Sequence, residues 1–339
     1  MLFVPVSGPY GMGEYARSAA IARAALERWP SLSVHFMLSR AAPYAADAPF
    51  PTTLLASSAT FHSAAVIDLI RAWRPHVVIF DNAGRGAQLR AARRLGAHVV
   101  YISARARQRR KAFRLRWMRL LDEHWIAYPE FVAGKLGPLE RAKLRLLGRP
   151  VVRFLDVILS RFASAGQPPS AHRSGGEPPI DVLVIPGGGT DHPGAGGAVQ
   201  AFRDAARSLA ASGFAATFVG PPAVPQSELA GLMRRARLIV VNGGSTLLQA
   251  IACGAPCVAV PIARDQRQRI RRCVRAGVAV ETSLDPQAIA ARAVELLKDE
   301  ATRSALAGRA AGLALTDGVE TALCALERLL DAEGDSSRV

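Results

Sequence analysis

Short apolar runs alternate with longer amphipathic stretches along almost the whole chain. The first apolar run covers residues 2–7, an amphipathic stretch follows at 13–29, and the same alternation then repeats. Because the runs are continuous and rich in Val and Ile, they predict strands buried on both faces, which is typical of a parallel sheet covered by helices. Further strands are expected in the first half at 32–39, 76–82, 98–103 and 123–129, and further helices at 63–73 and 86–96.

A segment without periodicity separates the two halves of the chain. Residues 160–179 are rich in Pro, Gly and Ser, which indicates a linker, and the alternation restarts at residue 180. The last two helices of the chain are expected at 286–298 and 302–328. The resulting domain prediction is an N-terminal Rossmann-like domain over 1–160, a linker over 161–179, a C-terminal Rossmann-like domain over 180–330 and a tail over 331–339. Two such α/β domains are expected to face a cleft, where ligands bind beyond the carboxyl ends of the strands.

Composition narrows the class of protein. A chain of 339 residues is longer than one core usually serves, and no apolar run reaches the ~18 residues of a membrane span. The chain starts directly with a predicted strand rather than a secretory leader, so a cytoplasmic location is expected. The four cysteines form no CxxC pair and are interpreted as buried thiols, so no metal site is expected. The net charge of +16 predicts an anionic partner.

Glycine-rich loops follow two of the predicted strands. In "SGPYGMGEYARS", Gly11 and Gly13 permit close approach of a ligand to the backbone, and the following helix offers free N–H groups to an anion. The alternative is a helix start that needs glycine for tight packing. In "PGGGTDHPGAGG", three consecutive glycines predict a wall along which substrate or phosphate passes, with a solvated loop as the alternative. The residues of this second loop that are expected to contact the nucleotide-sugar are Gly187, Gly188, Gly189 and Thr190.

A third loop, "NGGSTLLQ", also joins a predicted strand to a predicted helix. Gly243 and Gly244 followed by Ser245 and Thr246 predict a phosphate cradle at the helix N-terminus; the alternative is a hydroxyl cap on a tightly packed helix. Farther along, Asp265 and Gln266 follow a strand end and precede a helix. They suit the hydroxyls of a sugar, and Asp265 as a plain N-cap is the competing interpretation.

The order and spacing of these residues resemble those of GT-B nucleotide-sugar enzymes. The family pattern is Gly-x-Ser-Thr-Leu-x-Glu, then Gly-x-Pro, an apolar strand to Pro, and Asp-Gln. This chain has Gly243 to Gln249 in the pattern Gly-Gly-Ser-Thr-Leu-Leu-Gln, then "GAP" at 254–256, Pro261 and the Asp-Gln pair. The resemblance covers about residues 180–312. The family members that the chain resembles most are the N-acetylglucosaminyl transferase that forms lipid II and the UDP-sugar hydrolase of pseudaminic acid synthesis.

The resemblance implies roles for the C-terminal residues. Gly244, Ser245 and Thr246 would hold a diphosphate, and the Asp-Gln pair would contact the donor sugar. Gln249 stands where the family has a Glu that binds the ribose hydroxyls. An amide still bonds to hydroxyls but lacks the strength of a carboxylate.

The N-terminal loop resembles the family pattern Gly-x-Gly-His-x-x-Arg, here Gly11 to Arg17. Glu14 replaces the His, which acts as a base in the hydrolase, so the resemblance implies Glu14 as the base that deprotonates an acceptor. Asp81 and Asn82 end another predicted strand. Asp81 is expected to share the role of base or to hold Arg17, and Arg17 and Asn82 are assigned to the acceptor or phosphate loop.

A densely basic segment occupies the middle of the chain. Residues 105–121, "RARQRRKAFRLRWMRLL", contain no acid and intersperse Arg with Phe, Leu, Trp and Met. An amphipathic basic helix that lies on an anionic membrane is one interpretation, and a peripheral location on the membrane would follow from it. The other is a solvated basic face whose apolar residues pack inward. Nucleic acid is disfavoured, because no recognition module accompanies the charge. A basic cleft that binds a phosphorylated acceptor stays open as a further alternative.

These observations together predict a glycosyltransferase. It would move a sugar from a nucleotide-diphosphate donor, UDP being favoured, to a hydroxyl of an acceptor that is lipid-linked or amphiphilic. No DxD-type motif is present, so the reaction is expected to be metal-independent, with the nucleotide-sugar as co-substrate and no other cofactor. The family implies inversion at the sugar. A UDP-sugar hydrolase or epimerase on the same fold and a non-catalytic nucleotide-sugar-binding protein stay open as alternatives.

Overall fold

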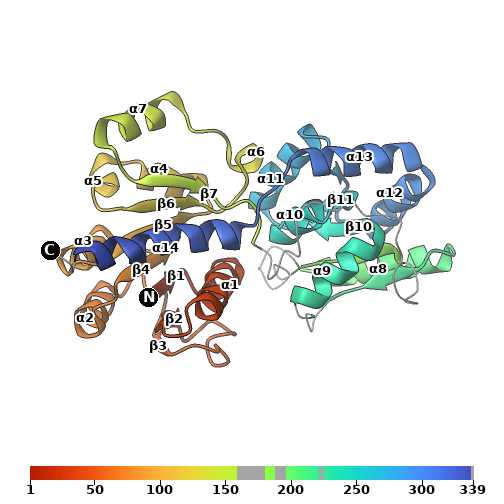
Figure 1. The fold of residues 1–339 in the computed structure, drawn as a ribbon. Coiled ribbons are helices and arrows are strands. Elements are labelled where there is room, and N and C mark those ends of the chain that lie inside the picture. The colour runs from red at the N-terminus through yellow and green to blue at the C-terminus, as the bar shows by residue number, and fades with distance from the viewer. Residues whose placement is uncertain (159–179, 188–195, 221–223, 225, 337–339) are drawn as a thin grey trace. The chain divides into compact units, whose positions relative to one another are not determined.

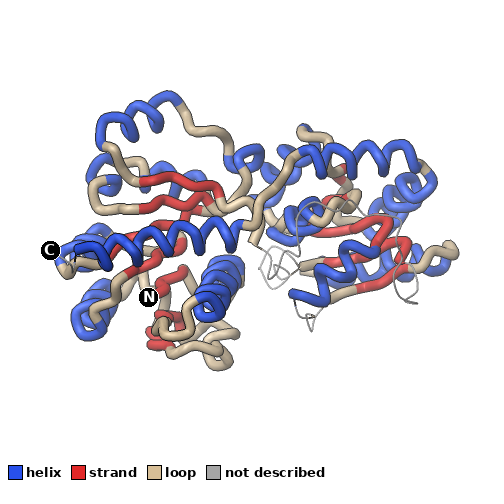
Figure 2. Tube along the Cα trace, viewed as in Figure 1, coloured by secondary structure: helices blue, strands red, loops and turns tan. Residues whose placement is uncertain are grey.

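The computed structural model describes residues 1–158, 180–187, 196–220, 224 and 226–336. The chain divides into two compact units, one formed by Met1–Ile158 with Asp317–Val339 and the other by Leu159–Thr316 (Figure 1). Each unit contains a parallel sheet flanked by helices (Figure 2). The predicted fold class, α/β with two Rossmann-like parallel-sheet domains, is therefore confirmed.

The strands of the first unit form one sheet in the order β3-β2-β1-β4-β5-β6-β7, and every neighbouring pair is parallel. β1 lies between β2 and β4, so the winding of the chain changes direction between β1 and β4. Such a switch point is where open α/β sheets bind ligands. The strands are β1 (Leu2–Pro5), β2 (His35–Ser39), β3 (Thr52–Leu55), β4 (Val77–Asp81), β5 (His98–Ser103), β6 (Glu123–Ile126) and β7 (Val151–Phe154).

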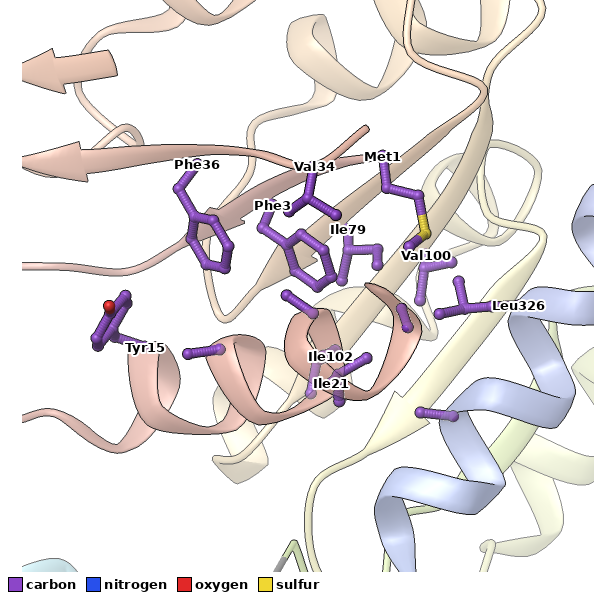
Figure 3. Close-up of a cluster of buried hydrophobic side chains, with 14 of the residues drawn as sticks. Met1, Phe3, Tyr15, Ile21, Val34, Phe36, Ile79, Val100, Ile102 and Leu326 are labelled. Carbon is purple, nitrogen blue, oxygen red and sulfur yellow. The ribbon is translucent and has the colours of Figure 1, made fainter. Parts of the chain in front are cut away.

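Helices cover both faces of this sheet. They are α1 (Gly13–Arg28), α2 (Ser63–Trp73), α3 (Gly86–Arg94), α4 (Ala106–Ala112), α5 (Leu115–Met118), α6 (Glu130–Ala133), α7 (Pro138–Leu147) and α14 (Gly318–Ser336). Phe3 stacks on Phe36 at 4.9 Å between ring centroids, and both belong to a core cluster that includes Ile21 of α1 and Leu326 of α14 (Figure 3). The alternate residues of β1, Leu2 and Val4, belong to the other cluster, which includes residues of α2 and α3.

The end of the chain differs from the expected domain boundary. Residues 302–328 were expected to form one helix of a C-terminal domain ending at 330, but α13 (Glu300–Gly312) stops in the second unit and α14 belongs to the first. The reason is an apolar stripe on α14, where Val319, Ala322 and Leu326 are buried in the core cluster that α1 helps to form. The helix also continues through most of the expected tail, to Ser336. The expected linker at 161–179 lies outside the described residues.

The second unit repeats the architecture with a shorter sheet, in the parallel order β12-β11-β10-β8-β9. Here the winding changes direction between β8 and β10. The strands are β8 (Ile180–Ile185), β9 (Ala216–Phe218), β10 (Ala236–Asn242), β11 (Cys257–Val260) and β12 (Val280–Glu281). The helices are α8 (Ala198–Ala211), α9 (Gln226–Arg235), α10 (Ser245–Ala252), α11 (Arg264–Arg275), α12 (Pro286–Lys298) and α13.

Candidate functional site

Most of the predicted site residues that the structure describes lie near the carboxyl ends of the strands that border each switch point, whereas Asp265 and Gln266 follow β11. In the first unit these are the loop after β1 and the residues after β4, and the Val6 N–H donates to the Asp81 carbonyl at 2.9 Å where the two strands end. In the second unit they are the residues after β8 and the turn between β10 and α10. Each unit therefore offers one candidate site, formed by its own residues.

The glycines of the loop after β1 border open space. A Cβ added to Gly8, Gly11 or Gly13 would meet no atom within 4 Å, and Gly11 has a left-handed backbone with φ of 82°. Tight packing, the alternative weighed for this loop, therefore does not explain Gly11 or Gly13. Gly13 begins α1, and none of the described side chains caps that helix. The loop leaves room for a ligand to reach the first turn of α1.

The Glu14 carboxylate is held in place on that first turn. Its Oε1 accepts a hydrogen bond from Asn82 Nδ2 at 2.9 Å, and Asn82 Oδ1 accepts one from the Ala104 N–H at 2.8 Å. Asn82 has φ of 52°, a left-handed conformation that Asn adopts more readily than most residues. Arg105 Nη2 lies 3.7 Å from Glu14 Oε1, and the Glu14 side chain is 16% exposed. Glu14 is thus oriented by Asn82 and still reaches the surface.

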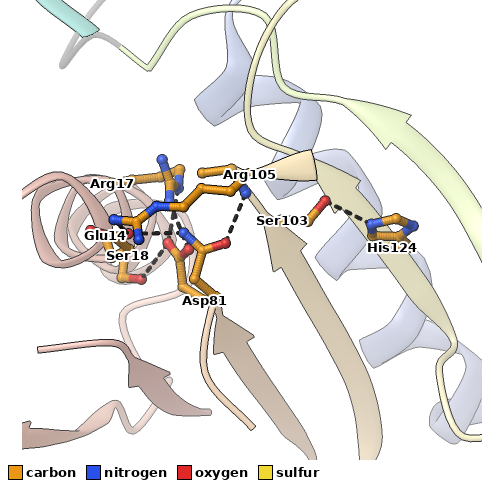
Figure 4. Close-up of polar contacts among 9 residues, drawn as sticks. Glu14, Arg17, Ser18, Asp81, Ser103, Arg105 and His124 are labelled. Carbon is orange, nitrogen blue, oxygen red and sulfur yellow. Dashed lines mark hydrogen bonds and ion pairs between the residues drawn. The ribbon is translucent and has the colours of Figure 1, made fainter. Parts of the chain in front are cut away.

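Arg17 and Asp81 form a buried ion pair beside it. Arg17 Nε and Nη2 donate to the two carboxylate oxygens at 2.8 and 2.6 Å, and the side chains are 6% and 0% exposed (Figure 4). Burial opposes the Arg17 charge, but the contact with Asp81 outweighs it and raises the pKa of Arg17. Burial raises the pKa of Asp81 to about 6 in spite of the guanidinium, so the carboxyl is mainly ionised at neutral pH.

This ion pair changes two of the sequence predictions. Asp81 holds Arg17, one of its two expected roles, but as a base it is sealed from solvent and already shares both oxygens. Arg17 is equally committed, so it is not free to bind a phosphate of the acceptor. Both residues instead fix the start of α1 against the end of β4. Of the two proposed bases, Glu14 is the one that a substrate hydroxyl can approach.

In the second unit, Asn242 joins the two loops at the switch point. Its Nδ2 donates to the Pro186 carbonyl at 2.5 Å, and its Oδ1 accepts from the Gly244 N–H at 2.8 Å. A Cβ on Gly187, which has φ of 74°, would lie 2.5 Å from Asn242 Nδ2, and one on Gly244 would lie 2.7 Å from Oδ1. Glycine is required at both positions by the close approach of this side chain. Gly188, Gly189 and Thr190 lie outside the described residues.

Gly243 is enclosed in the same way, from the side of α11. An added Cβ would lie 2.7 Å from Ile270 Cδ1 and 2.8 Å from Gln266 Cβ. Gln266 Oε1 accepts the Gly243 N–H at 3.2 Å and the Ile262 N–H at 3.0 Å, and Arg269 donates to the Gly243 carbonyl. The Gln266 oxygen, expected on the donor sugar, is therefore committed to the backbone. The N–H groups of both glycines are already bonded, so they are not the free amides that the phosphate cradle requires.

The free donors of this turn lie one residue farther along, at the start of α10. Ser245, Thr246 and Leu247 occupy the first turn of the helix, where no preceding turn supplies acceptors for their N–H groups. No side chain caps α10 within the described residues, so neither hydroxyl is used as the cap that the alternative interpretation requires. Ser245 is exposed and Thr246 is half-buried. These residues combine helix-terminal amides with hydroxyls that form no hydrogen bond to another described residue.

Two further residues were predicted to bind the nucleotide-sugar, one on α10 and one at the start of α11. Gln249 is buried in α10 with 6% of its surface exposed, and the Asp265 side chain at the start of α11 is 65% exposed. Asp265 is not the N-cap of α11, since that position is Ala263, and its carboxylate lies 3.9 Å from Arg269 Nη2. Its exposure leaves it accessible to a ligand.

Sequence reasoning missed Asn242, although it organises the second site. The signal was present, because Asn242 is a polar residue that ends the strand directly after the apolar run from Leu238 to Val241, and it precedes two glycines. An amide at a strand end can bond to both neighbouring loops, and the glycines leave room for it.

The basic segment 105–121 forms two short helices rather than one amphipathic helix. Phe113, Trp117, Met118 and Leu121 are buried, so these apolar side chains belong to the core and not to a membrane-facing side. The interpretation as a solvated basic face agrees with this packing, and Leu115 is the exposed exception. Among the described residues, no helix has the length and apolar character needed to cross a membrane.

A buried histidine lies nearby on β6. His124 Nε2 is 2.9 Å from Ser103 Oγ (Figure 4), and its ring packs edge-on against Phe113. Burial, and secondly the charge of Arg109, lower the pKa of His124 to about 3, so the imidazole is neutral. No group of three or more His, Cys, Asp or Glu side chains arranged to hold a metal ion occurs in the part of the chain that is described.

The sequence matches no protein-family model and no curated protein. Solved structures nevertheless share its fold. The glycosyltransferase SnogD from Streptomyces nogalater is 18% identical with a TM-score of 0.61, over 97% of this chain and 99% of that chain. Spinosyn rhamnosyltransferase SpnG, complexed with thymidine diphosphate, is 18% identical with a TM-score of 0.59, over 98% and 100%. A putative UDP-N-acetylglucosamine 2-epimerase from Listeria monocytogenes is 13% identical with a TM-score of 0.53, over 92% and 93%. The chain therefore has the GT-B fold, over nearly its whole length.

Proposed function

We propose that this protein is a glycosyltransferase that uses a nucleotide-diphosphate sugar as its donor. The observation that carries the proposal is the start of α10 at the switch point of the second sheet. Among the described residues, no hydrogen bond occupies its first-turn amides or the hydroxyls of Ser245 and Thr246, and these groups suit a diphosphate. The fold agrees, because glycosyltransferases are among the structures that share it, one of them complexed with thymidine diphosphate.

The second unit would bind the donor. Ser245 and Thr246 would hold the diphosphate, Gln249 would bond to the ribose and Asp265 to the sugar, with UDP as the favoured nucleotide. The positive end of the α10 dipole would stabilise the charge that develops on the leaving diphosphate, so that the protein supplies this stabilisation without a metal ion. Asn242 and Gln266 would act indirectly, by fixing the turn that positions the helix start.

The first unit would supply the base. Glu14 would take the proton from an acceptor hydroxyl, whose oxygen attacks the anomeric carbon of the sugar. The bond from that carbon to the diphosphate oxygen breaks, and the nucleotide diphosphate leaves with the electron pair. Because the acceptor attacks the face opposite the leaving group, the configuration at the anomeric carbon is inverted. Asn82 would keep Glu14 oriented through the 2.9 Å hydrogen bond, as the third member of a triad orients its base. The open space beside Gly11 and Gly13 would admit the acceptor.

Donor binding is tested by calorimetry with UDP and thymidine diphosphate. Thr246→Val keeps the shape of the side chain and removes one donor, so the affinity should fall by ~1–2 kcal/mol. Thr282→Val, on the loop after β12, is the matched control and should leave the affinity unchanged. If the wild-type protein binds neither nucleotide, or if Thr246→Val binds as tightly as the wild type, the cradle at α10 is wrong.

Catalysis is tested by incubating the protein with a UDP-sugar, with and without candidate acceptors. Glu14→Gln should lower the rate of sugar transfer by roughly 10²–10⁴-fold, the usual contribution of a general base, and leave UDP binding intact. Glu27→Gln, at an exposed position on the same helix, is the control. Free sugar or a new epimer formed without acceptor would instead establish the hydrolase or epimerase. Full activity of Glu14→Gln would exclude Glu14 as the base.

A further inference from the structure

A basic hollow of about 320 Å³ lies on the surface of the first unit. It is formed by the start of α3 together with α4 and α5, segments that are separated in the sequence. The buried ring of Trp117 lines it. Its charged lining consists of Arg85, Arg90, Lys111, Arg114 and Arg116, without an acidic residue.

Lys111 is the innermost of these cations. Its Nζ donates to the Gly84 carbonyl at 2.8 Å and lies 4.1 Å from the centroid of the Trp117 ring. Burial, followed by the charges of Arg85, Arg114 and Arg107, lowers the pKa of Lys111 to about 8. A carbonyl and an aromatic face attract a cation but carry no full negative charge. The ammonium is therefore held in place without being neutralised.

Other basic side chains of the same unit are neutralised by acids. Asp122 accepts hydrogen bonds from Arg93 at 2.9 Å and from Arg149 at 2.7 Å, and Glu140 pairs with Arg109 at 2.6 Å. In contrast, the described residues provide no ion pair for Arg90, Arg114 or Arg116, all of which are exposed. Like charges that converge repel one another unless an anion joins them. The hollow differs from an ordinary solvated surface in this convergence without a counter-charge.

The basic surface continues across α3. A neighbouring hollow of about 520 Å³ shares Arg90 with the first and adds Arg71 and Arg94 to the cationic lining. Arg71 pairs with the exposed Asp68 at 3.5 Å. The concentration of charge is therefore greatest around Arg90, where the two hollows meet.

We propose that the hollow at Arg90, Lys111, Arg114 and Arg116 is a binding site for a phosphate group. A phosphate monoester or diphosphate carries more than one negative charge and several acceptor oxygens, and guanidinium groups bind such oxygens in pairs. A single carboxylate would leave most of these cations unpaired. The phosphate belongs either to a free phosphorylated compound or to a lipid headgroup. This site is additional to the one at α10 and does not depend on the proposed transferase activity.

The test compares two variants that remove the same amount of charge. Arg90→Gln/Arg114→Gln/Arg116→Gln empties the rim of the hollow and keeps Lys111, which contacts the Gly84 carbonyl. Arg23→Gln/Arg40→Gln/Arg328→Gln changes exposed arginines elsewhere in the first unit. Inorganic pyrophosphate is titrated by calorimetry into the wild type, the two variants and Thr246→Val, which alters the proposed donor site at α10 instead of the hollow. In a second arm, the proteins are sedimented with phosphatidylcholine vesicles with or without phosphatidic acid.

The rim variant should bind pyrophosphate about tenfold or more weakly than the wild type, and the control variant should bind it like the wild type. That result supports a free phosphate ligand. If the wild type and the control variant sediment with phosphatidic acid vesicles and the rim variant does not, the ligand is a lipid headgroup. Equal losses in both variants would mean that net charge alone attracts the anion, and this would overturn the proposal, as would no binding of either probe. UDP binding reports separately on the transferase proposal.

Discussion

The buried pair of Arg17 and Asp81 allows a stability prediction for Asp81→Asn. Asparagine preserves the shape of the side chain but removes the charge, so the guanidinium would stay buried without its partner. Removing one member of a buried ion pair costs about 3–5 kcal/mol. The two hydrogen bonds of 2.8 and 2.6 Å and the near-complete burial of both side chains place this pair in that class. We expect a loss of about 4 kcal/mol in the free energy of unfolding of the first unit.

Tryptophan fluorescence measures this loss for one unit alone, because Trp29, Trp73, Trp117 and Trp125 all belong to the first unit. With a denaturant slope of roughly 4 kcal/mol per molar guanidinium chloride, the midpoint should fall by about 1 M. The exposed pair of Asp68 and Arg71 provides the control: Asp68→Asn should cost less than about 1 kcal/mol.

A double variant separates the lost charge from lost packing. Arg17→Met/Asp81→Leu removes both charges and should be more stable than Asp81→Asn alone, since apolar side chains replace buried ion pairs at little cost. The reasoning would be refuted if Asp81→Asn lowered the midpoint no more than Asp68→Asn does.

Two further predictions concern glycine packing and pH. Gly243→Ala should destabilise the second unit by about 1–3 kcal/mol, because the new Cβ would lie 2.7 Å from Ile270. The Cβ of Gly13→Ala would meet no atom within 4 Å, so this variant should be neutral or slightly stabilising. Thermal unfolding followed by circular dichroism compares the two variants. His124 takes up a proton near pH 6.5 when unfolded but only near pH 3 when folded, so stability is lost as the pH falls through this window, by about 2 kcal/mol at pH 5. His124→Gln should remove that part of the pH dependence, and equal slopes for both proteins in fluorescence-detected unfolding would contradict it.

The apolar runs predicted the sheets well, because residues buried on both faces leave a strong signal. β3 and β7 were not predicted: they are edge strands, half-exposed, with Thr52 and Thr53 in the first and Arg153 in the second. The boundary near residue 316 was also missed. An amphipathic helix records that one of its faces is buried but not which sheet it packs on.

The candidate site also contains features that the sequence predicted and features that it did not. The positions of Glu14, Ser245 and Thr246 at helix starts followed from the pattern, and all three lie there. The contact of Arg17 with Asp81, 64 positions away, was one of the two roles expected of Asp81. The bond from Gly243 to Gln266, 23 positions away, did not follow from the sequence, which suggested a sugar as the partner of Gln266. The glycines show the limit clearly. Similar sequences are open at Gly11 and closed at Gly243, and only the three-dimensional neighbours decide which.

The return of α14 to the first unit affects how the protein is made. Domains generally fold from the N-terminus as the chain leaves the ribosome. Here Val319, Ala322 and Leu326 complete the core around β1 and α1, so that core stays unfinished until the last helix has been synthesised. The second unit is continuous in sequence and has all its residues earlier. During biosynthesis the later-encoded unit can therefore finish folding first, while the core of the N-terminal sheet still lacks α14.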